Sequence, residues 1–141
     1  MFSKFFRKKE INKPIKKNVL VAALLIHAAK IDENYTDNEK IIIKKAIEDL
    51  DGVSKNESDL ILIEAEKKEQ ESNQIIEFTR EIKNNPLEYR IKIIEILWKI
   101  VYSDGNNDSY ETNLIRRVCG LLYVSDKDSG KASLRVKELL K

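Results

Sequence analysis

Two short segments of the chain, 72 positions apart, carry oxygen-bearing side chains in the same order. In each segment an Asp ends an apolar stretch and a Glu follows seven residues later. Alternating oxygen-bearing side chains let a tight loop turn several oxygens inward, as hard cations such as Ca²⁺ and Mg²⁺ require. The duplicated loops therefore predict a divalent-cation site. Its candidate ligands are Asp32 and Glu39 in the first loop and Asp104, Asn106, Asp108 and Glu111 in the second, with Asn34 and Thr36 at the alternating positions of the first.

The spacing narrows the kind of cation site. The Glu stands at position 8 of each loop rather than at 12, and no Gly occupies position 6, so the loops are not EF-hands. Neither loop holds a thiol, and His27 lies elsewhere, which argues against zinc. Ca²⁺ or Mg²⁺ is favoured, with Mn²⁺ as an alternative. So few carboxylates per loop predict a dissociation constant of about 10⁻⁴–10⁻³ M.

Helix capping is a rival explanation of the same residues. Thr36-x-x-Glu39 and Asp108-x-x-Glu111 both fit the capping box, in which the Glu closes the first turn of a helix. Asp32 and Asp104 favour the cation instead, because each falls at the C-terminal end of a predicted helix. The helix dipole disfavours a carboxylate there by about 0.3–1 kcal/mol, which a bound cation would offset. Both interpretations stay open.

Helical periodicity runs through most of the chain, and strand-like alternation is absent. We predict an all-α domain of six or seven helices with an internal duplication of a helix–acidic loop–helix unit. Ser54-x-x-Glu57 is a further capping box, and Gly52 suits a left-handed helix end. The most apolar helix, after Pro86, is expected in the middle of the bundle. The predicted helices cover about residues 18–31, 36–50, 54–71, 73–83, 86–103, 108–122 and 125–140.

The chain of 141 residues is long enough for one domain, which we place at residues 18–141 behind a tail of residues 1–17. The tail carries seven Lys or Arg against one Glu, a net +6, so a total of +2 leaves −4 for the remainder. An acidic body argues against nucleic-acid binding. The tail is either a solvated end or, through Phe2, Phe5 and Phe6 beside its cations, a peripheral contact with an anionic membrane.

No segment approaches the ~20 apolar residues of a membrane span. Cys119 is the only cysteine, which favours a reducing compartment; we expect a cytoplasmic protein, with membrane association through the tail as an option. No nucleophile–base arrangement, Gly-rich phosphate loop or Cys cluster occurs, so an enzyme is not expected. A two-metal hydrolase would have only Arg116 and Arg117 to orient a substrate. His27 and Trp98 are predicted to be core residues.

These residues also carry a family resemblance. The stretch from Leu97-Trp-Lys-Ile-Val-Tyr-Ser-Asp104-Gly through Asp108-x-Tyr-Glu111 resembles the second acidic motif of the tellurite-resistance TerB-like proteins, in particular the stand-alone, short bacterial branch. The first unit, ending at Glu39, is similar to the family's first motif, and the segment from Phe78 resembles the middle section of that branch. The likeness covers about residues 18–135. The first motif departs from the family at Asp32-Glu33, where the family has Asp-Gly.

The resemblance implies a helical fold of two related halves whose acidic residues bind divalent cations. It also implies a link to tellurite and other chemical stress, often near membranes; a related domain precedes the membrane-tethered J-domain of some co-chaperones. We therefore predict a non-enzymatic, divalent-cation-binding module that acts as a stress-response sensor or adaptor for a protein partner that the sequence does not identify. The alternative is a metal-free protein- or membrane-interaction module whose acidic loops only cap helices.

Overall fold

A computed structural model describes residues 16–32, 35–72, 74–103 and 109–140, without the side chains of residues 32 and 109–111. The described part is helical throughout and contains no strand, which confirms the predicted all-α fold. Predicted and observed helices agree to within a few residues. The elements are α2 (Lys17–Ala29), η1 (Lys30–Asp32), α3 (Asp37–Asp51), α4 (Lys55–Glu71), α5 (Ile76–Ile82), α6 (Leu87–Ser103), α7 (Ser109–Leu122) and α8 (Asp126–Leu139).

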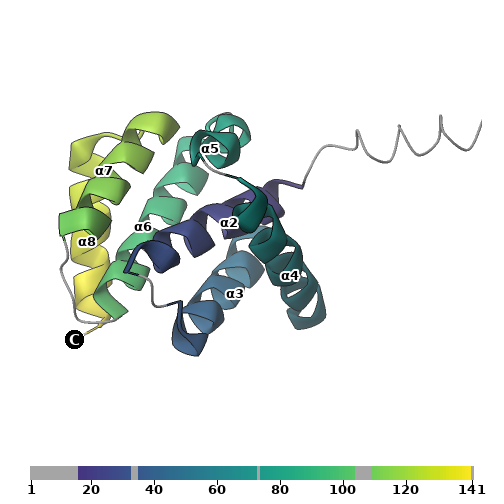
Figure 1. The fold of residues 1–141 in the computed structure, drawn as a ribbon. Helices are drawn as coiled ribbons and strands as arrows, with labels where there is room; N and C mark the ends of the chain where they lie inside the picture. Colours follow the sequence, from purple (N-terminus) through teal and green to yellow (C-terminus); the bar gives the residue numbers. More distant parts are fainter. Residues whose placement is uncertain (1–15, 33–34, 73, 104–108, 141) are drawn as a thin grey trace, which may run out of the picture.

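Helix α2 is the centre of the bundle. Ten of its 13 residues are buried, including every position from Val19 to Ile26. It packs against α3, α4, α5 and α6, so that in Figure 1 it crosses between α3 and α4 on one side and α6 to α8 on the other. The helix after Pro86, predicted for the middle of the bundle, is α6, which contacts α2, α3, α7 and α8. Helix α6 buries one face, and its other face carries exposed lysines at Lys92 and Lys99.

The helix ends follow the predicted local chemistry. Thr36 and Glu39 form the full capping box at the start of α3. Ser54 accepts a hydrogen bond from the Glu57 amide at 3.1 Å, which is the serine half of the box predicted there. At the end of α3, Gly52 has φ +63° and ψ 31°, the left-handed conformation that glycine adopts without steric cost. Short-range sequence signals therefore set where the helices begin and end.

Helices α6 and α8 meet along a seam of small and aromatic residues. Trp98 donates its indole N–H to the Ser129 hydroxyl at 3.2 Å, and the Tyr102 and Ser133 hydroxyls lie 2.6 Å apart. Small side chains, Ser129, Ala132 and Ser133, form the buried face of α8 together with Val136. Trp98, predicted to be core, is thus partly buried and hydrogen-bonded at this seam.

The duplicated units lie in contact. The first unit consists of α2, η1 and α3, and the second of α6 and α7 with the segment between them. Helix α2 packs on α6, and η1 packs on α7, so the end of the first unit's leading helix lies against the second unit's trailing helix. No helix in the described ranges is both long and apolar enough to cross a membrane.

Candidate functional site

The six predicted ligands are distributed unevenly over the described structure. Asp32 is the last residue of η1, and Glu111 lies in the first turn of α7, although the side chains of both are outside the description. Asp104, Asn106 and Asp108 fall outside the described residues. Because η1 contacts α7, the two elements that carry Asp32 and Glu111 belong to one region of the bundle.

Glu39 is the one predicted ligand whose side chain is described, and it works as a helix cap. Its Oε1 accepts hydrogen bonds from the Thr36 amide at 2.9 Å and from the Thr36 hydroxyl at 3.1 Å. The Glu39 amide donates in return to Thr36 Oγ1 at 3.1 Å. The residue is 3% exposed. This geometry confirms the predicted capping box at Thr36 and Glu39, in which one carboxylate oxygen of Glu39 accepts from two donors.

The end of α2 is linked to α4 through Glu69, which contacts Lys30 and His27. The Lys30 ammonium lies 2.9 Å from Glu69 Oε2, and His27 Nδ1 lies 3.3 Å from Glu69 Oε1. The Glu69 side chain is only 11% exposed, so its charge depends on these two partners rather than on water. His27 was predicted to be a core histidine, and it is half-buried, with its ring centre 6.4 Å from that of Phe78. Its described polar partner is the Glu69 carboxylate.

A second cation approaches the first loop from α3. The Lys40 ammonium lies 5.0 Å from the centre of the Tyr35 ring and 3.6 Å from the Glu66 carboxylate. The Lys30 ammonium stands 5.8 Å from the same ring. Burial, and then the nearby Glu66 charge, raises the pKa of the Tyr35 phenol above its ordinary value. Two lysines therefore lie near the Tyr35 ring, and each is paired with a glutamate of α4.

The donor set fits a cation unequally in the two loops. The residues of the second unit at the positions equivalent to Lys30 and Lys40 are Tyr102 and Thr112. Both of these side chains are neutral. Among the described side chains, no group of three or more His, Cys, Asp or Glu residues is arranged to hold a metal ion. The candidate ligands of the second loop include three carboxylates, Asp104, Asp108 and Glu111, and those of the first loop include two, Asp32 and Glu39.

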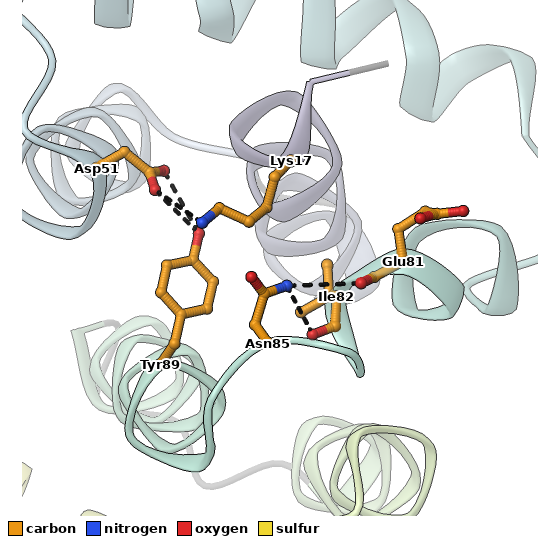
Figure 2. A network of polar contacts seen from close by, with 6 residues as sticks. All are labelled: Lys17, Asp51, Glu81, Ile82, Asn85 and Tyr89. Carbon is orange, nitrogen blue, oxygen red and sulfur yellow. Dashed lines mark hydrogen bonds and ion pairs between the residues drawn. The ribbon is translucent and has the colours of Figure 1, made fainter. Parts of the chain in front are cut away.

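A network that the pattern analysis missed shows how this fold treats an Asp at a helix end. Asp51 closes α3, and Figure 2 shows the Lys17 ammonium and the Tyr89 hydroxyl both directed at its carboxylate. The Tyr89 hydroxyl donates a hydrogen bond to Asp51 Oδ1 at 3.2 Å. The Lys17 ammonium lies 3.8 Å from the same oxygen and 4.3 Å from the centre of the Tyr89 ring. The helix dipole disfavours an Asp at that position, and this rule could have signalled a cationic partner. Here a lysine supplies the positive charge.

Three further residues take ordinary places. Burial raises the pKa of the Cys119 thiol, as expected for an inert core cysteine. Arg116 and Arg117 are both exposed on α7, and neither forms an ion pair with another described side chain.

The fold is therefore that of an all-α domain in which two related helix–loop–helix units pack together. A family model for the tellurite resistance protein TerB matches residues 18–134, and the chain belongs to the TerB family. Neither the comparison with curated proteins nor the comparison with solved structures returned a match.

Proposed function

We propose that the protein is a non-enzymatic, divalent-cation-binding module that acts in stress response as a sensor or adaptor. The observation that supports this most is the contact between η1, which ends at Asp32, and α7, which carries Glu111 in its first turn. That contact draws elements of both acidic loops into one region. Carboxylates gathered in one place repel one another unless a cation or a proton compensates. Membership of the TerB family supports a role in tellurite-resistance-like stress response.

The second loop is the principal cation site in this proposal. Asp104 and Glu111 are direct ligands, with Asp108 and Asn106 binding directly or through water. Asp32 and Glu39 form a weaker half-site, because Glu39 already accepts two hydrogen bonds. Ca²⁺ or Mg²⁺ suits these oxygen ligands best, and Mn²⁺ is the alternative.

The test is thermal unfolding of EDTA-treated protein, titrated separately with Ca²⁺, Mg²⁺ and Mn²⁺. A cation that binds only the folded state stabilises it by RT ln(1 + [L]/Kd), about 2.7 kcal/mol at one hundred times Kd. The variant Asp104→Asn/Glu111→Gln should lose this rise. The matched control Asp49→Asn/Glu64→Gln removes the same charges from exposed positions on α3 and α4 and should keep it. An equal rise in both variants, or no rise in the unaltered protein, would remove the proposal.

A metal-free interaction module is the second candidate, and two observations favour it. Glu39 has a complete structural role as a cap, and the Asp at the end of α3 is compensated by a lysine. Under this candidate the cation titration is flat. A membrane role would then depend on the basic tail, and deleting residues 1–17 should abolish binding to vesicles that contain anionic lipid. Undiminished vesicle binding by the shortened chain would exclude the tail as the contact.

A further inference from the structure

A groove of about 290 Å³ runs between α3 and α6. Its apolar lining comes from Ile42, Ala46 and Leu50 on α3 and from Ile96 on α6. Ala46 and Ile96 are buried, whereas Ile42 and Leu50 are partly exposed, so the aliphatic surface opens to solvent along the groove. Nothing in the proposed cation site uses this surface.

Lysines line both sides of the groove. Lys45 stands on α3, and Lys92 and Lys99 stand on α6; all three are exposed. None of the three forms an ion pair with another described side chain. Of the two acidic residues in the lining, Glu95 is already paired with Arg135, which leaves Asp49 as the only other acidic group there.

This positive charge is local rather than general. Residues 18–141 carry a net charge of −4, so an unpaired lysine cluster stands out against the body of the domain. Like charges brought together without a partner cost free energy, and an anionic ligand would remove that cost. An apolar floor between cationic rims complements a ligand with one aliphatic side and acidic flanks.

We propose that the α3–α6 groove docks an acidic amphipathic helix of a partner protein. The chain's own tail is a poor occupant, because residues 1–17 carry a net +6 and would meet the three lysines. Helices that dock in grooves place apolar side chains at i, i+3, i+4 and i+7 against the floor.

The lysine spacing predicts the pattern of acidic residues on the partner. Lys92 and Lys99 are seven residues apart on α6, which is about two helical turns and about 10 Å along the axis. A helix that lies along α6 meets both with two Glu residues seven positions apart. Lys45, on the opposite rim, meets a third acidic side chain across the apolar stripe.

The experiment measures binding of a fluorescent helical peptide by anisotropy, in EDTA, so that the result is independent of the cation proposal. The peptide has about 20 residues, long enough to be helical, with Leu at i, i+4, i+7 and i+11 and Glu at flanking positions seven apart. We expect saturable binding that weakens at least tenfold in Lys92→Glu/Lys99→Glu and in Lys45→Glu. The control Lys127→Glu/Lys131→Glu, at exposed sites on α8, should bind as the unaltered protein does.

A charge-swapped peptide, with Lys in place of each Glu, completes the design. It should bind Lys92→Glu/Lys99→Glu and not the unaltered protein. Equal binding of the acidic peptide to all variants, or no binding at any concentration, would overturn the proposal. Sedimentation of the protein alone tests a second copy as occupant: assembly abolished by Lys92→Glu/Lys99→Glu, without peptide binding, would replace the partner helix with self-association. Circular dichroism shows whether each variant is folded.

Discussion

The two duplicated units are alike in sequence pattern but are anchored by different chemistry. The first unit's loop is bordered by charges, with Lys30 on Glu69 and Lys40 on Glu66 of α4. At the position equivalent to Lys30, the second unit has Tyr102, which bonds the neutral Ser133 hydroxyl of α8. A lysine lies near the anchor of the second unit as well, with the Lys137 ammonium 5.5 Å from the centre of the Tyr102 ring. The units therefore differ in the bond itself, which is an ion pair in the first and a contact between two hydroxyl groups in the second.

The leading helices of the two units also differ in burial. Helix α2 is covered on nearly all sides, whereas α6 has one face open to solvent and to the groove. Both helices have four neighbouring helices, α3 to α6 around α2 and α2, α3, α7 and α8 around α6, so the number of neighbours alone does not set the difference. Duplication supplied two similar helices, and the surrounding elements gave them different roles.

The largest predicted effect concerns the cores of the two units. Leu25 and Leu97 are equivalent positions 72 residues apart, and both are fully buried. Replacing either with Ala should lower the free energy of unfolding by about 2–5 kcal/mol, because each leaves a cavity. Urea denaturation of both variants measures this. A loss below about 1 kcal/mol for Leu97→Ala alone would show that the second unit repacks easily and is not an equal half of the core.

The next effect separates the charged anchor from the neutral one. Glu69→Gln should cost about 1.5–3 kcal/mol, because it removes the charge that Lys30 and His27 contact. Ser133→Ala removes one neutral hydrogen bond and should cost about 0.5–1.5 kcal/mol. The double variant Lys30→Met/Glu69→Leu should lose less than the sum of its single changes, since it leaves no unpaired charge. Additive losses in denaturant titrations would contradict the ion-pair account of the first anchor.

Glu39 distinguishes a cap from a cation ligand. In EDTA, Glu39→Ala should lower stability by about 1–2 kcal/mol through loss of the capping box, comparable to losing an N-cap. Glu39→Gln should cost much less, because Gln also completes a capping box. If Glu39 acted mainly as a ligand, neither change would matter in EDTA and both would weaken the cation response. Thermal unfolding with and without cation separates the two outcomes.

The smallest effect tests the lysine-compensated Asp at the end of α3. Tyr89→Phe removes the hydrogen bond to Asp51 and should cost about 0.5–1.5 kcal/mol at neutral pH. Burial, and then the Asp51 charge, raises the pKa of the Tyr89 phenol. The folded protein therefore holds this proton more tightly than the unfolded chain, whose tyrosine pKa is about 10. The free energy of unfolding should therefore decrease above about pH 10, and Tyr89→Phe should make that decrease less steep. If the variant has the same slope of stability against pH, Tyr89 does not cause the decrease.

Local signals in the sequence predicted the helices and their ends well. Thr36, Gly52 and Ser125 act within one or two turns, so their effects do not depend on the rest of the fold. The burial of α2 could not be predicted this way, because it depends on which elements surround the helix. Counting apolar residues in the helix after Pro86 also overlooked the stripe formed by Lys92 and Lys99.

The candidate site was harder to predict than the fold. That Glu39 would fit a capping box was evident from its spacing, but the lysines around it come from η1 and α3 and are anchored by α4. The rule that an Asp at a helix end needs a cation was sound, and Asp51 shows that the cation can be a distant lysine. Sequence spacing identified the charges that need compensation; the tertiary arrangement determines which group provides it.

The central position of α2 has a consequence during synthesis. It is the first of the described helices to leave the ribosome, and it packs against α3, α4, α5 and finally α6. At about 5–20 residues per second, the emerging chain waits several seconds before α6 is available to cover it. During that interval part of the surface that α2 buries in the finished protein is still uncovered, so its packing is completed late in synthesis.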